Sequence, residues 1–153
     1  MSRLAPVRSL RLRDLGPADL PEIIRIDAAH TGRPRAEYWS VVLRDFLDGK
    51  DGRLRVGLAA ERGGRLVGHL LGEVRAFEFG SEPCGWIFAV GVDPAELREG
   101  VGSGLLRVAC RRFTAAGIHR VRTMVRRDDI PMLSFFRAAG MVGGPFVQLE
   151  LNP

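Results

Sequence analysis

The order of elements along the chain predicts an α/β fold, in which helices flank both faces of a mixed, mostly antiparallel central sheet. Three observations support this prediction. Two helical patterns lie near the N-terminus, three strands follow in succession, and the second half alternates helices with strands. The succession of strands without an intervening helix argues against an all-parallel, doubly wound sheet.

The N-terminal part is predicted to contain one short strand and two helices. Apolar and basic residues alternate over Val7–Arg13, as in a strand. Pro17 and Asp19 then open a helix whose apolar residues follow the 3.6-residue period: Leu20, Ile23, Ile24 and Ala28. A second helix begins at Pro34. Its expected buried stripe consists of Tyr38, Val41, Val42, Asp45 and Phe46.

Three strands are predicted in the middle of the chain. Apolar residues occupy every second position over Leu54–Ala60, which is typical of a half-buried strand. A glycine-rich hairpin connects it to a long partner strand over Leu66–Phe79. Trp86–Val92 is apolar without alternation, so we expect a central strand that is covered on both faces.

A glycine-rich turn then leads into a helix that begins near Gly102 and is capped by Gly117. A further strand is predicted over Val121–Val125. The next helix starts with Asp129 as its N-cap and has a proline in its first turn. The alternation in Phe146–Leu151 predicts a final strand.

Length and composition place the chain among compact proteins. Its 153 residues, 46% of them hydrophobic, suit one domain over residues 1–153 with one core. No secretory leader or bilayer-spanning stretch is visible, so we expect a cytoplasmic protein without a membrane partner. Cys84 and Cys110 lack the spacing of a zinc site, so no metal is expected.

The net charge of +5 comes almost entirely from arginine, since Lys50 is the only lysine. Arginine binds phosphate groups in a bidentate manner, which favours an anionic ligand. The arginines are scattered among acidic residues and form no basic stripe. We therefore do not expect nucleic acid as a partner.

The strongest chemical signal is the turn between the strand ending at Val92 and the helix near Gly102. Glycines let the backbone approach an anion closely, and free N–H groups at a helix N-terminus favour phosphate. The turn has no Gly-Lys-Ser/Thr sequence, which excludes a Walker A loop. Leu105 stands where a dinucleotide-binding fingerprint needs its third glycine. The pattern indicates a pyrophosphate site of another kind.

The turn resembles the acetyl-CoA motif of the GNAT N-acetyltransferase superfamily. Val92-Asp93-Pro94 matches the strand end, and Gly100–Leu106 matches the glycine-rich helix start, whereas Leu97 replaces the usual Gln or Arg. A second family motif has its counterpart in residues 125–141. There Asp129 replaces Asn, Met132 replaces Ala, Phe136 replaces Tyr and Met141 replaces Phe.

The resemblance implies that acetyl-CoA is the co-substrate. It implies that backbone N–H groups at Val90 and Val92 bind the pantetheine arm and the thioester carbonyl. The pyrophosphate would be bound by Arg98, Glu99, Gly100, Val101, Gly102, Ser103 and Gly104. The second motif adds Asp129 and Phe136 to the residues that would bind acetyl-CoA.

The catalytic acid and base do not follow from the resemblance, because the family's usual Glu and Tyr positions hold Phe88 and Phe136. Glu73 is a candidate base, since burial within a strand would raise its pKa; pairing with Arg75 is the structural alternative. Asp128 is a second candidate, for which helix capping is the alternative. His30, in the loop after the first helix, is a third; a solvated side chain is its alternative.

The predicted function is transfer of an acetyl group from acetyl-CoA to a primary amine by direct attack in a ternary complex. The acceptor, a small molecule or a protein amine, stays open, as does a homodimer formed through the C-terminal strand. An acyl-CoA-binding domain without turnover is the alternative, since both usual catalytic positions are phenylalanine.

Overall fold

The structure, a computed structural model, describes residues 9–76 and 79–153. Contacts group the chain into two compact units, Met1–Thr123 and Met124–Pro153. The first unit contains β1 (Leu10–Asp14), η1 (Pro17–Asp19), α1 (Leu20–Thr31), α2 (Ala36–Asp48), β2 (Arg55–Arg62), β3 (Arg65–Arg75), β4 (Cys84–Val92), η2 (Pro94–Glu96), α3 (Val101–Ala115) and β5 (Val121–Thr123). The second contains α4 (Ile130–Ala138). That residues 1–153 form one domain stays a prediction.

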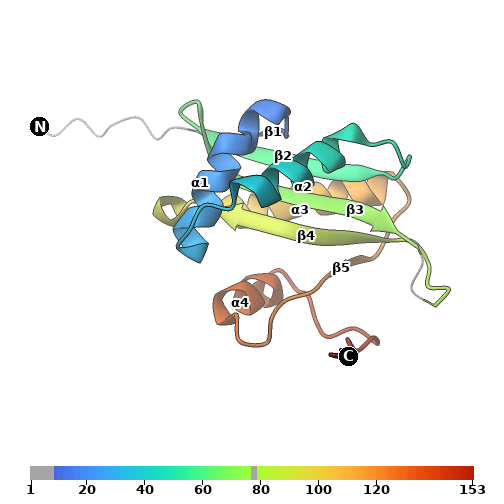
Figure 1. The fold of residues 1–153 in the computed structure, drawn as a ribbon. Coiled ribbons are helices and arrows are strands. Elements are labelled where there is room, and N and C mark those ends of the chain that lie inside the picture. Colours follow the sequence, from blue (N-terminus) through green and yellow to red (C-terminus); the bar gives the residue numbers. More distant parts are fainter. Residues whose placement is uncertain (1–8, 77–78) are drawn as a thin grey trace, which may run out of the picture. The chain divides into compact units, whose positions relative to one another are not determined.

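The sheet has the strand order β1-β2-β3-β4-β5. The first four strands run antiparallel, and only β5 runs parallel to its neighbour β4 (Figure 1). The predicted mixed, mostly antiparallel sheet is therefore confirmed. The connections from β2 to β3 and from β3 to β4 are short, whereas α1 and α2 lie between β1 and β2. The parallel pair is joined by a crossover through α3, as parallel pairing requires.

Helices cover both faces of this sheet, as predicted (Figure 1). On one face, Ile23 and Ile26 of α1 join a core with α2 and with Leu71 of β3. On the other face, α3 packs so closely that a Cβ on Gly85 would lie 2.7 Å from the Phe113 ring. The glycines of β3 and β4 thus let a large aromatic side chain fill the space under the sheet.

The predicted buried stripe of α2 was wrong. Trp39, Leu43 and Phe46 are its buried residues, whereas Tyr38 is 51% exposed and Val41 42% exposed. The sequence allows two neighbouring stripes on this helix that share Phe46. Packing against α1 and β3 selects the one that buries the larger indole of Trp39.

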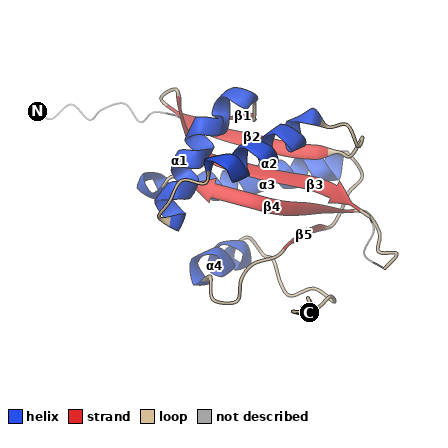
Figure 2. Ribbon diagram, in the orientation of Figure 1, coloured by secondary structure: helices blue, strands red, loops and turns tan. Residues whose placement is uncertain are grey.

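Several predicted strand limits also differ from the structure. The residues of the first strand before position 9, and Phe77 in the third, lie outside the described residues; β3 ends at Arg75. β4 is not covered on both faces, since Phe88 is 40% exposed. Phe146–Leu151 forms no strand within the described residues, which Figure 2 draws as loop after α4. Alternation alone does not make a strand, because a strand also needs a hydrogen-bonded partner.

Candidate functional site

The C-terminal half of β4 has a free edge, meaning that no strand of the described residues pairs with it there. β5 pairs with β4 only from Gly85 to Ile87, while β4 continues to Val92. Asp93 N–H donates to the Val67 carbonyl at 2.8 Å, so Val92 and its partner Gly68 form a non-hydrogen-bonded pair. In such a pair, the N–H and C=O groups of each residue point away from the other strand. By alternation, the same holds for Val90, so two backbone N–H groups face away from β3.

A β-bulge lies where β5 ends. Leu71 pairs with Ala89 and Gly72 pairs with Ile87, which leaves Phe88 as an extra residue in β4. A bulge bends its strand and increases the local twist. The free edge of β4 therefore begins at the point where its direction changes, and Phe88 contacts the Phe46 ring of α2, with 6.0 Å between ring centroids.

The turn after β4 presents further N–H groups. Arg98 and Gly100 have φ angles of 69° and 78°, which bring the backbone round to the start of α3. The first intrahelical hydrogen bond joins Gly104 N–H to the Gly100 carbonyl at 2.9 Å, and no side chain caps this end of the helix. The N–H groups of residues 101–103 thus remain for a ligand, and the helix dipole favours an anion there.

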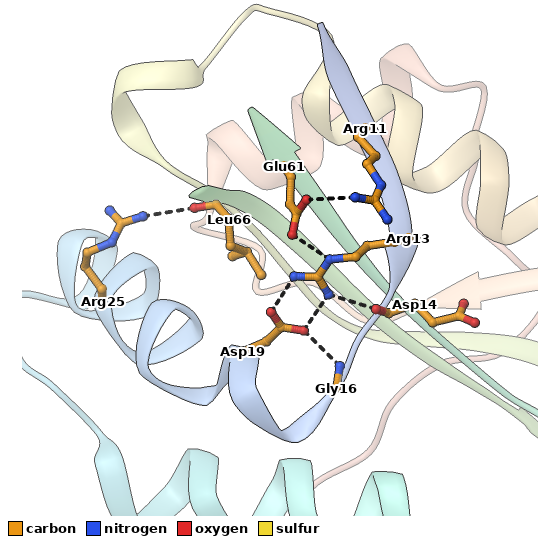
Figure 3. Close-up of polar contacts among 8 residues, drawn as sticks. All are labelled: Arg11, Arg13, Asp14, Gly16, Asp19, Arg25, Glu61 and Leu66. Atoms are coloured by element: carbon orange, nitrogen blue, oxygen red, sulfur yellow. Dashed lines mark hydrogen bonds and ion pairs between the residues drawn. The ribbon is translucent and has the colours of Figure 1, made fainter. Parts of the chain in front are cut away.

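The turn is attached to α1 through Arg25. Its guanidinium donates to the Asp93 carboxylate at 2.8 Å. It also donates to the Leu66 carbonyl at 3.1 Å (Figure 3). Burial opposes the ionisation of Asp93, but hydrogen bonds from the Ala95 N–H and Arg25 outweigh it, so the pKa of Asp93 is lowered. A carboxylate that is ionised at neutral pH therefore joins α1 to the first turn after β4.

Two histidines lie near the end of β4. His30, in the last turn of α1, is exposed and places its Nε2 at 2.6 Å from the Val92 carbonyl oxygen. His69 of β3 is buried against Gly91, and its ring meets Trp39 edge to face at 5.5 Å. Burial lowers the pKa of His69 to about 4, so this histidine is neutral at physiological pH.

The candidate base Glu73 lies nearer the other end of β4, opposite Trp86. Its carboxylate accepts from Arg75 Nε at 2.7 Å, and Arg53 lies 3.9 Å away. Glu73 is thus paired with Arg75, as the structural alternative predicted. A catalytic role for Glu73 stays a prediction.

The remaining predicted residues belong to the second unit. Arg126 forms a bidentate ion pair with Asp128 and lowers the pKa of that exposed carboxylate. Asp129 caps α4 by accepting from the Met132 N–H at 3.2 Å, so its predicted capping role is confirmed. Phe136 is buried and packs against Phe135, with 5.0 Å between ring centroids.

Comparison with known proteins decides the family. The model of the acetyltransferase (GNAT) family matches residues 20–141, from α1 to just beyond α4. The chain belongs to the GNAT acetyltransferase family. The resemblance in the two sequence motifs is thereby confirmed.

Among curated GNAT relatives, a mycothiol acetyltransferase from Saccharomonospora viridis is 31% identical over 86 residues. The match covers 54% of this chain and 28% of that protein, so the chain matches about a quarter of its relative's length. No helix among the described residues is long and apolar enough to cross a membrane.

Solved GNAT structures share the fold at low sequence identity. An aminoglycoside N-acetyltransferase in complex with CoA superposes with a TM-score of 0.82 at 14% identity, covering 97% of this chain and 99% of that one. An aminoglycoside 6'-N-acetyltransferase from Acinetobacter haemolyticus gives 0.78 at 17% identity, covering 94% and 98%. At this identity the likeness concerns the fold alone.

Neither the bond from Arg25 to Asp93 nor the contact between His30 and Val92 is predictable from the sequence. Both join α1 to the end of β4, across more than sixty positions of sequence. No local pattern marks such a pair. The Asp-Pro sequence after Val92 indicated a strand end but carried no information on the partner of Asp93.

Proposed function

We propose that this chain transfers an acetyl group from acetyl-CoA to a primary amine by direct attack within a ternary complex. The observation that carries the proposal is the row of outward N–H groups at Val90 and Val92, continued by the uncapped start of α3. The two strand amides are suited to a chain of amide groups, as in pantetheine. The helix start is suited to a pyrophosphate.

The same N–H groups would assist the chemistry. Negative charge develops on the thioester oxygen when an amine attacks the carbonyl carbon, and fixed backbone donors stabilise such charge without reorganising. The amine nitrogen forms the new C–N bond, the C–S bond breaks, and the electron pair leaves with sulfur. The amine must also lose a proton, which requires a base.

Binding is tested by calorimetric titration with acetyl-CoA, using two serine variants. Ser103 lies in the first turn of α3, and Ser40 lies on α2; both are exposed. Ser103→Glu places a negative charge where the pyrophosphate would bind, although an acidic residue suits a helix N-terminus and should preserve the fold. We expect Ser103→Glu to weaken binding by at least about tenfold, or 1.4 kcal/mol.

Ser40→Glu adds the same charge away from the site and should leave the affinity unchanged. Turnover is then measured as release of the CoA thiol in the presence of amines. Equal affinity for both variants and the wild type, or no binding by the wild type, would contradict the proposed acetyl-CoA site.

The acceptor is proposed only as a class, a primary amine of a small molecule or a protein. A screen would begin with aminoglycosides, because the two structural neighbours are aminoglycoside N-acetyltransferases, and with peptide N-termini. A cytoplasmic location and a homodimer are further predictions, which cell fractionation and the mass in solution would test.

A second candidate is an acyl-CoA-binding domain without turnover. It is favoured by phenylalanine at both usual catalytic positions, Phe88 and Phe136, neither of which can exchange a proton. Saturable binding of acetyl-CoA with no thiol release for any amine would support this candidate over the transferase.

A further inference from the structure

The contact between His30 and Val92 determines which nitrogen of the imidazole is basic. A carbonyl oxygen can only accept a hydrogen bond, so His30 Nε2, at 2.6 Å from the Val92 oxygen, carries a proton. In the neutral ring, the lone pair is then on Nδ1. The side chain is exposed, and no described residue forms a hydrogen bond with Nδ1.

We infer that His30 is the general base of the acetyl transfer, with Nδ1 as the atom that takes the proton of the attacking amine. The inference rests on the proposed function and supplies the base that it lacks. As the C–N bond forms and the C–S bond breaks, the amine proton moves to His30 Nδ1. The CoA sulfur leaves as a thiolate and is protonated by solvent, and His30 returns its proton to solvent.

The position of His30 supports this role. Val92 is one of the two residues whose N–H groups face outward along the free edge, and His30 binds the carbonyl of that same residue. The imidazole is therefore held next to the backbone donors that would bind the thioester. Its orientation is set by the strand itself, as a catalytic base requires.

The carboxylates nearest His30 in sequence and structure are paired with arginines. Asp27, one turn earlier in α1, accepts hydrogen bonds from Arg35 Nε at 2.8 Å and from Arg35 Nη2 at 2.6 Å. Asp93, at the end of β4, is paired with Arg25. His69 of β3 is neutral at physiological pH, so it adds no charge to the surroundings of His30. Within the described part of the chain, no carboxylate forms a hydrogen bond or ion pair with His30.

The other candidate bases are less available. Glu73 is held by Arg75 at 2.7 Å, and Asp128 is held by two bonds from Arg126. For Asp128, this pairing lowers the pKa of the carboxylate, which makes it a weaker base. Among the groups described here, His30 combines accessibility with a fixed contact to the free edge of β4.

The test is the variant His30→Gln, because the glutamine amide can still donate to the Val92 carbonyl but cannot act as a base. The readouts are acetyl-CoA affinity by calorimetry, kcat, and the dependence of kcat/KM on pH. We expect unchanged affinity, kcat lowered by about 100-fold or more, and loss of the acidic limb of the pH profile. Added imidazole should partly restore the rate of His30→Ala.

The matched control is His119→Gln, which changes another exposed histidine. It should keep both the rate and the acidic limb. The inference is overturned if His30→Gln keeps the acidic limb, if it loses acetyl-CoA affinity in proportion to its rate, or if Glu73→Gln alone removes the limb. Failure of the proposed function differs from these outcomes, since the wild type would then bind no acetyl-CoA.

Discussion

The His69 ring occupies the space where any side chain on Gly91 would lie. A Cβ on Gly91 would be 2.4 Å from His69 Cε1 and 3.0 Å from Nε2. The two residues are directly paired between β3 and β4, and the ring is buried beneath Trp39. Gly91 is therefore required by packing against His69.

The first prediction is that Gly91→Ala destabilises the protein by about 1–3 kcal/mol, because a buried ring cannot yield without disturbing its neighbours. Chemical unfolding would measure the change. Combining it with His69→Ala should cost less than the sum of the two single changes, since the clash is then relieved. Additive effects would show that the contact is not what requires glycine.

The second prediction concerns pH. Burial lowers the pKa of His69 from 6.5 to about 4 in the folded chain, so between these values only the unfolded chain binds the proton. Stability therefore rises with pH through this window and is lost as the pH falls from about 6.5 to about 4. Thermal unfolding of His69→Leu should depend less on pH there than the wild type. His119→Leu is the control and should follow the wild type.

The third prediction tests whether the ion pair between Arg25 and Asp93 affects acetyl-CoA binding or only stability. Arg25→Met removes the bond to Asp93 and should raise the KM for acetyl-CoA severalfold with little change in kcat, because the turn after β4 is no longer held to α1.

Arg13→Met provides the comparison, since Arg13 joins β1 to Asp19 and Glu61 away from that turn (Figure 3). It should lower the free energy of unfolding by about 1–3 kcal/mol and leave KM unchanged. Equal effects of both variants on KM would mean that Arg25 acts only through stability.

The fourth prediction concerns α4 in the second unit. Asp129→Ala removes the hydrogen bond to the Met132 N–H and should destabilise this helix by about 1 kcal/mol, whereas Asp129→Asn keeps an acceptor and should cost less. Hydrogen exchange of the α4 amides would report the difference. Equal exchange in both variants would contradict the capping role.

The sequence by itself determined the fold class, the family and the order of elements from the first strand to α4, but not the final strand predicted over Phe146–Leu151. The turn residues, the hydrophobic periods and the glycine-rich motif after Val92 can each be recognised within a short stretch of sequence. Local backbone preferences are sufficient to predict the turns, helices and strands that they mark. The N-cap at Asp129 was predicted for the same reason, because an N-cap depends only on residues within one turn of helix.

Only the tertiary structure decided which stripe of α2 is buried, where β5 stops pairing, and which groups meet at the end of β4. Trp39 rather than Tyr38 enters the core because of what α1 and β3 present to it. The contacts of Arg25 with Asp93 and of His30 with Val92 join residues more than sixty positions apart. Such pairs arise from the packing of α1 on the sheet, and no pattern within either segment encodes them.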